Sequence, residues 1–143
     1  MQLMTQSGNL GPKWFHVALR AMVILAETKF LLKSHQIADM IGADSTFIRK
    51  VLALLSKADL VSSYGGRYGG YTLEKSACEI SVGDIYVALA TEPPDPDCTV
   101  PSTESELYIS NIISKAEQEF RTILEGYTLD DIVKQTNIHQ LYE

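Results

Sequence analysis

The 143-residue sequence lacks several features that define particular classes of protein. Its two cysteines, Cys78 and Cys98, are too few for a disulfide framework and do not have the spacing of a zinc site. No run approaches the roughly 18 apolar residues of a membrane span, and no cationic segment followed by an apolar one marks a signal peptide. We therefore expect a cytoplasmic protein without a membrane partner.

Patterns that would indicate catalysis are also missing. The sequence shows no nucleophile beside a base and no paired carboxylates in an apolar setting. The glycine-rich stretch from Gly65 to Gly70 lacks the Lys-Ser/Thr ending and the following helix of a phosphate-binding loop. His16 and His35 have no cysteine or histidine partner at ligand spacing. We expect neither an enzyme nor a metal site.

Basic residues are scarce overall but are unevenly distributed. The net charge is -6, yet residues 1–75 hold nine Lys and Arg against five Asp and Glu, giving +4. Residues 76–143 hold three against thirteen, giving -10. The first half is therefore able to face nucleic acid, and we expect the acidic half to face away. The alternative is that the acidic helices are simply solvated.

Two helices and a tight turn are predicted between residues 34 and 57. Ser34 is placed to cap a short helix that Gly42 closes, at a position that favours positive φ. Asp44 or Ser45 can cap a second helix. Its apolar stripe consists of Phe47, Ile48, Val51, Leu52, Leu54 and Leu55. This arrangement is typical of a helix-turn-helix, with an ordinary pair of core helices as the alternative.

A hairpin follows the second helix and makes the motif a winged one. Residues 60–64 and 71–73 have the composition of strands, and the glycines between them indicate a turn. The polar front of the second helix suits a phosphate backbone and base edges. The candidate DNA contacts are Ser34, Ser45, Thr46, Arg49, Lys50, Arg67 and Tyr68.

Apolar helices flank this motif. Pro12 suits the first turn of a helix that continues to about Ala26. On this helix we expect Trp14 to be a packing anchor in the core, with contact to a ligand as the alternative. Cys78 is expected to pack as a small apolar group. Ser81 is placed to cap a helix that ends near Leu89.

A long helix is predicted from Glu104 to about Glu125, after a proline-rich loop. Its apolar seam repeats every 3.5 to 3.6 residues, roughly the period of a helix face that needs a partner surface. The seam residues are Ile109, Ile112, Ile113, Ala116, Phe120 and Ile123. We predict that this helix forms a homodimer, which also matches a palindromic DNA site; a helix folded back on its own domain is the alternative.

The predicted fold is mostly α with a small β-hairpin: a winged helix-turn-helix plus a long C-terminal dimerisation helix. Residues 1–90 form the DNA-binding domain, residues 91–103 a loop, and residues 104–143 the dimerisation helix and a short C-terminal helix capped by Thr128.

Several segments together resemble the bacterial Rrf-two family of winged-helix regulators, over essentially the whole chain. They are Ser34-x-x-Ile37-Ala38, Phe47-Ile48-x-Lys50-Val51-Leu52-x-x-Leu55, Gly69-Gly70-Tyr71-x-Leu73 and Ile80-x-Val82-x-Asp84-Ile85. The family includes the iron-sulfur cluster regulator, the nitric-oxide-sensing repressor and the cysteine-metabolism repressor. The resemblance implies a dimeric transcription factor, usually a repressor, with the second helix of the motif in the major groove and the wing against the minor groove.

The sequence departs from that family in two places. Cluster-binding members carry three closely spaced cysteines in the loop before the dimerisation helix, whereas Cys98 stands alone there, so we predict no iron-sulfur cluster and no other cofactor. The family's wing arginine is replaced by Gly65, and Arg67 is the candidate to enter the minor groove instead.

The signal that controls the regulator stays open. Cys98 is a redox-sensor candidate, although Asp95 and Asp97 disfavour its thiolate. A small molecule held between the winged domain and the long helix, or a protein partner, are the other possibilities. A winged helix used as a protein-interaction module is the alternative to DNA binding.

Overall fold

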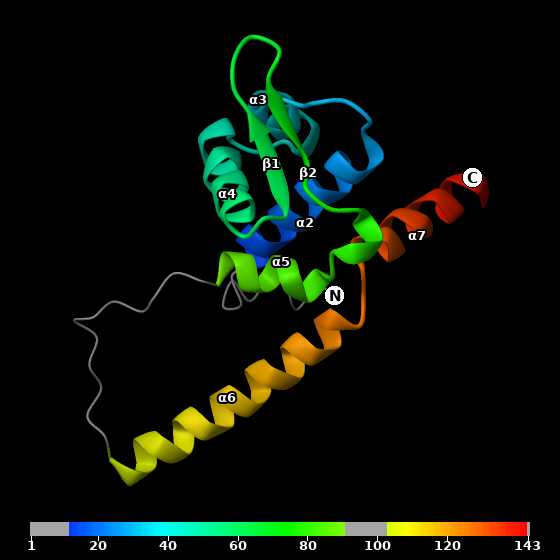
Figure 1. The fold of residues 1–143 in the computed structure, drawn as a ribbon. Coiled ribbons are helices and arrows are strands. Elements are labelled where there is room, and N and C mark those ends of the chain that lie inside the picture. The colour runs from blue at the N-terminus through cyan, green and yellow to red at the C-terminus, as the bar shows by residue number, and fades with distance from the viewer. Residues whose placement is uncertain (1–11, 91–102, 143) are drawn as a thin grey trace.

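The computed structural model describes residues 12–90 and 103–142 (Figure 1). It is mostly helical with one small antiparallel hairpin, which confirms the predicted fold class. The elements in chain order are α2 (Pro12–Glu27), α3 (Ser34–Ile41), α4 (Ser45–Lys57), β1 (Val61–Tyr64), β2 (Gly70–Leu73), the 3-10 turn η1 (Ala77–Glu79), α5 (Val82–Leu89), α6 (Glu104–Glu125) and α7 (Leu129–Tyr142).

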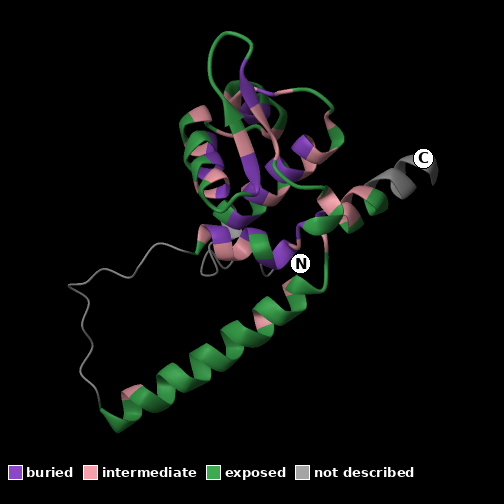
Figure 2. Ribbon diagram, viewed as in Figure 1, coloured by how far each residue is buried: buried purple, intermediate pink, exposed green. Residues whose placement is uncertain are grey.

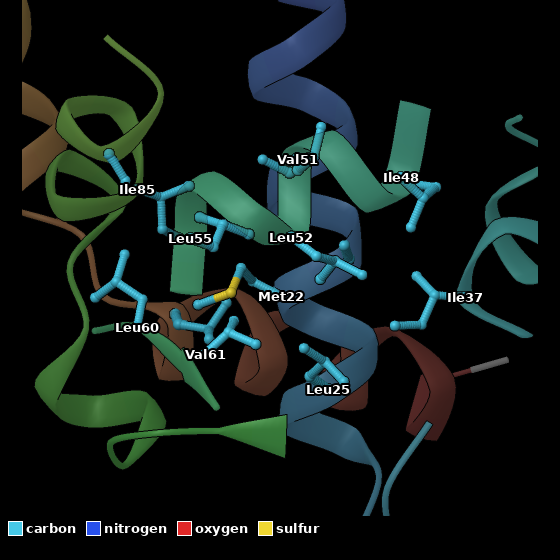
Figure 3. Close-up of a cluster of buried hydrophobic side chains, with 14 of the residues drawn as sticks. Met22, Leu25, Ile37, Ile48, Val51, Leu52, Leu55, Leu60, Val61 and Ile85 are labelled. Atoms are coloured by element: carbon cyan, nitrogen blue, oxygen red, sulfur yellow. The ribbon is translucent and has the colours of Figure 1, made fainter. Parts of the chain in front are cut away.

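One hydrophobic core joins the helices of the winged domain. Helix α2 begins at Pro12, as predicted, and passes through the centre of the domain, where α3, α4, α5 and α7 pack against it. Figure 3 shows the side chains that meet there: Met22, Leu25, Ile37, Ile48, Val51, Leu52, Leu55, Leu60, Val61 and Ile85. Leu52 has no exposed surface, and burial of such a side chain contributes about 1.5–3 kcal/mol.

The helix-turn-helix forms from local signals. Gly42 ends α3 with φ +80°, and its N–H donates to Ala38 O at 2.8 Å. Asp44 caps α4, because its Oδ2 accepts from the Phe47 N–H at 3.2 Å. The predicted cap at Ser34 is wrong: Lys33 holds that position, and its N–H donates to Gln36 Oε1 at 2.8 Å.

The wing is a two-stranded hairpin with an added bridge. Strand β1 pairs with β2 in the register Val61↔Leu73 to Tyr64↔Gly70. Leu32, between α2 and α3, bridges Tyr71 through two backbone hydrogen bonds of 3.2 and 2.7 Å. A Cβ at Gly70 would lie 2.8 Å from Leu32 O, so this close approach requires glycine. The wing is therefore anchored to the start of the helix-turn-helix.

The long helix α6 joins the winged domain at its C-terminal end. The Val82 N–H donates to Tyr127 O, and the Leu129 N–H donates to Ile80 O, both at 2.8 Å. The Phe120 ring packs edge-to-face on Tyr86, with centroids 5.1 Å apart. Ser81 caps α5 and Thr128 precedes α7 with its hydroxyl accepting from the Asp131 N–H, as predicted, but α7 is 14 residues long rather than short.

Most of α6 extends away from the domain. Figures 1 and 2 show it leaving the winged domain at the side opposite the wing, with an exposed surface along nearly all its length. The structure describes all 22 residues of α6, and none of them is buried. Over residues 12–90 and 103–142, no helix is both long enough and apolar enough to cross a membrane.

Candidate nucleic-acid interface

The exposed face of α4 carries the first group of candidate DNA contacts. Ser45 is half-buried at the first position of the helix, and Thr46, Arg49 and Lys50 are exposed. The opposite side of α4 packs into the core through Ile48, Val51, Leu52 and Leu55. This burial fixes the helix while its basic side chains point to solvent, as a helix that enters a major groove requires.

The turn of the wing carries the second group. Arg67 and Tyr68 lie in the turn between β1 and β2, and Tyr68 is 85% exposed. The Arg67 guanidinium carbon lies 5.8 Å from the centroid of the Tyr68 ring, a cation–π distance. The hairpin tip, which contains both residues, projects beyond α3 and α4 in Figure 1. An arginine placed in this way can reach into a narrow minor groove.

Lys33, just before α3, contacts the wing turn and was missed from the sequence. Its Nζ donates to Gly66 O in the wing turn at 3.4 Å, across 33 residues of sequence. Ser34 follows it as the first residue of α3 and is half-buried. The exposed His35 comes next. A cation at the start of a helix-turn-helix could have indicated a DNA contact from the sequence alone. Its contact with the wing could not, because that contact depends on the fold.

The cations of this face are not neutralised within the described part of the chain. The salt bridge found there joins Lys134 and Asp130 on α7 at 2.9 Å, and Arg49, Lys50 and Arg67 take part in none. Two carboxylates are nearby in sequence: Asp39 is exposed on α3, and Asp44 is engaged as the cap of α4. The acidic helix α6 lies at the far side of the domain from the wing (Figure 1). For α6, the charge separation predicted from the sequence is therefore present in space.

The predicted dimer seam is exposed at its N-terminal part. Ile109, Ile112 and Ile113 are 47%, 52% and 54% exposed, and Ala116 is also exposed. Ile123, nearer the domain, is 63% exposed. Phe120 is half-buried against Tyr86, so only this part of the seam folds back on its own domain. The rest of the seam forms a continuous apolar stripe without a cover in the described residues.

The two cysteines lie in different settings. Cys78 was expected to pack as an apolar group, but that prediction is wrong: it is exposed on η1, with Sγ 3.2 Å from Ser76 Oγ. Cys98, the redox-sensor candidate, lies outside the described residues.

The residues that the structure describes do not fit an iron-sulfur cluster. They contain one thiol, Cys78, and no group of three or more His, Cys, Asp or Glu able to hold a metal ion. Cluster ligation needs several thiolates together. The absence of a cofactor remains a prediction of the sequence.

Trp14 is not a core residue, contrary to expectation. It is 38% exposed and packs edge-to-face on Phe47 of α4, with ring centroids 4.5 Å apart. One turn and a half further along α2, Arg20 Nη1 donates to Ile41 O at 3.3 Å. The buried positions of α2 face the core through Phe15, Ala18, Ala21, Met22 and Leu25, which leaves Trp14 and Arg20 on the side that faces the α3–α4 turn.

A winged helix-turn-helix with an unneutralised basic face defines a DNA-binding module, and comparison with known proteins agrees. Residues 13–135 match the Rrf2 family, described as "Iron-dependent Transcriptional regulator". The HTH-type transcriptional regulator NsrR of Oceanobacillus iheyensis is 30% identical over 129 residues, which cover 85% of this chain and 88% of NsrR.

Solved structures give the same result. IscR of T. potens has a TM-score of 0.66 and 26% identity, covering 86% of this chain and 85% of its own. The oxidized form of CymR of Staphylococcus aureus has a TM-score of 0.61 and 26% identity, covering 84% of this chain and 92% of its own. The chain belongs to the Rrf2 family of winged-helix transcriptional regulators, as its sequence motifs indicated. It is a DNA-binding regulator of transcription.

Proposed function

We propose that this regulator is a cytoplasmic homodimeric repressor that binds a palindromic operator. In each protomer α4 enters the major groove, with Ser45, Thr46, Arg49 and Lys50 at base edges and phosphates. Arg67 and Tyr68 of the wing lie against the adjacent minor groove, and Ser34 contacts the backbone at the start of α3. The two-fold axis of the dimer matches the two-fold symmetry of the operator.

The observation that carries the dimer is the exposed seam of α6. Helix α6 has 22 residues, none of them buried, and carries a stripe of roughly half-exposed isoleucines, an apolar surface of the kind that a partner covers. In a two-fold dimer the same patch of both protomers forms the interface, so the stripe of one copy packs against the stripe of the other. The seam then becomes the core of the dimer, made by Ile109, Ile112, Ile113, Ala116, Phe120 and Ile123.

The observation that supports groove binding is the unpaired charge of α4 and the wing. Phosphate contacts by such cations release counterions, so operator affinity falls steeply as salt rises. The alternative is a protein-interaction module. Such a module would bind its partner through residues other than these cations and would show no preference for a DNA sequence.

A fluorescence-anisotropy titration against the promoter of its own gene, at two salt concentrations, tests the proposal. Arg49→Ala should weaken specific binding by about 1–3 kcal/mol, because it removes a major-groove cation. Lys57→Ala, at the other end of α4, is the matched control and should change binding little. Equal affinity of the wild type and Arg49→Ala, or binding that ignores sequence, would count against this assignment.

We also propose that Cys98 makes the regulator responsive to thiol oxidation. One of the solved structures similar to this chain is an oxidized form of CymR of Staphylococcus aureus, which supports the proposal. Cys98→Ser should keep DNA binding and abolish any response to oxidant. Cys78→Ser is the comparison, because Cys78 is an exposed thiol on η1. A response that survives Cys98→Ser and disappears in Cys78→Ser would assign the sensor to Cys78 instead.

A further inference from the structure

A hollow of about 500 Å³ lies between α2 and the turn that joins α3 to α4. One wall is the Trp14–Phe47 ring pair, and Val17 and Ile41 continue the apolar surface. The rim carries two opposite charges, the Arg20 guanidinium and the Asp44 carboxylate. A concave apolar surface with a few convergent polar groups is the usual form of a small-molecule site.

The two charges are held in place but are not paired with each other. Arg20 uses Nη1 to donate to Ile41 O, and its remaining donors make no hydrogen bond to the described residues. Asp44 uses Oδ2 to accept from the Phe47 N–H. No salt bridge joins Arg20 to Asp44 in the part of the chain that the structure describes. Each charge therefore keeps capacity for an external partner.

We propose that this hollow binds a free α-amino acid with a large apolar side chain. The ligand carboxylate binds the Arg20 guanidinium, whose planar fork matches two carboxylate oxygens. The ligand ammonium binds the Asp44 oxygen that the cap leaves free. The side chain covers the faces of Trp14 and Phe47. A ligand with only a negative charge fits less well, because the Asp44 carboxylate would repel it. A ligand with only a positive charge would be repelled by the Arg20 guanidinium.

The position of the hollow gives the ligand a route to regulation, and this step rests on the DNA-binding function proposed above. Asp44 caps α4, the helix proposed to enter the major groove, and the α3–α4 turn forms one side of the hollow. A bound amino acid ties this turn to α2 and so changes the operator affinity. By thermodynamic linkage, operator DNA then changes amino acid affinity by the same factor.

Binding is measurable without DNA, because Trp14 is the only tryptophan in the sequence. Its emission reports the hollow directly, and its 38% exposure leaves room for a shift to shorter wavelength when a ligand covers it. We expect L-phenylalanine and L-leucine to give a saturable shift with half-saturation below about 1 mM, the range open to a shallow site. Failure of DNA binding would leave this titration unaffected.

Ligand analogues test the charge assignment on the unmodified protein. 3-Phenylpropanoate lacks the ammonium and phenethylamine lacks the carboxylate, so each should bind about tenfold more weakly than L-phenylalanine, or worse. Asp44→Asn keeps the cap of α4 and removes the charge, so it should also weaken binding about tenfold. Arg20→Gln should do the same, and Arg121→Gln on the remote helix α6 is its matched control.

No saturable change in Trp14 emission up to about 10 mM amino acid would overturn the proposal. So would equal binding of the two analogues and L-phenylalanine, or unchanged binding by Asp44→Asn. A shift produced by inorganic phosphate alone, at the same concentrations, would identify the hollow as an anion site and would also overturn it.

Discussion

Replacing Ile112 by alanine tests whether a second copy covers the seam of α6. Ile112 is 52% exposed in the protomer, so the proposed dimer has about half of its side chain left to bury. Complete burial of an isoleucine contributes about 1.5–3 kcal/mol, which gives about 1 kcal/mol for that half. The dimer contains the residue twice. Ile112→Ala should therefore weaken dimerisation by about 2 kcal/mol, or roughly 30-fold in the dissociation constant.

Sedimentation velocity over a dilution series measures this constant directly. Leu107→Ala is the matched control, because Leu107 is similarly exposed, at 59%, but lies about 140° around the helix from Ile112. Circular dichroism should show both variants folded, since neither side chain is buried in its own domain. An Ile112→Ala dimer as stable as the wild type would refute the assigned seam, and so would equal weakening by Leu107→Ala.

Two other predictions concern stability. Gly70→Ala should lower the free energy of unfolding by about 1–3 kcal/mol, measured by urea titration, because its φ is +156° and its Cβ would lie 2.8 Å from Leu32 O. Gly65→Ala, with no atom within 4 Å of the added Cβ, should change stability little. The Thr128 N–H donates to Asp131 and lowers the pKa of that carboxyl. The ionised Asp131 therefore stabilises the fold above the ordinary carboxyl pKa of about 4, and this stabilisation is lost as the pH falls further. Asp131→Asn should flatten this acid-side loss in urea titrations between about pH 5 and pH 2, and an unchanged slope would count against the assignment.

The sequence predicted best those features that depend on neighbouring residues. Gly42 at the end of α3, Asp44 at the start of α4 and Ser81 at the start of α5 all act within four residues. The bounds of α6, Glu104 to Glu125, were also predicted correctly, because its first turn is capped by Thr103 and its end is marked by glycine. Caps and turn glycines satisfy backbone groups locally, so their signal is contained in the sequence.

Predictions of burial failed where the answer depends on distant segments. Trp14 is the only tryptophan of the sequence and was expected in the core, yet α2 turns it toward the α3–α4 turn. Cys78 is exposed because η1 turns its neighbour Ala77, not Cys78, toward the core. The cap of α3 was displaced by one residue, because Gln36 accepts from the backbone of Lys33 instead of Ser34 supplying the cap.

The candidate site was predictable as a set of residues but not as an assembly. Arg49, Lys50 and Arg67 are exposed as expected for DNA contacts. The Lys33–Gly66 contact spans 33 residues and the Arg20–Ile41 contact spans 21, and no local pattern indicates either pair. Such contacts appear only when the core places α2, α3 and the wing side by side.

The contact between α5 and α6 controls where the seam lies. A Cβ at Gly83 would lie 2.6 Å from Glu125 Cγ and 3.1 Å from Glu125 N, so a larger residue there would displace the Glu125 side chain and press on the backbone of α6. A helix of 22 residues is roughly 33 Å long, and a tilt of about 5° at its attached end moves the free end by about 3 Å. Ile109 and Ile112 lie toward that free end. Small changes at Gly83 are therefore amplified in the proposed dimer, where they would alter the separation of the two α4 helices and hence the half-site spacing that they recognise.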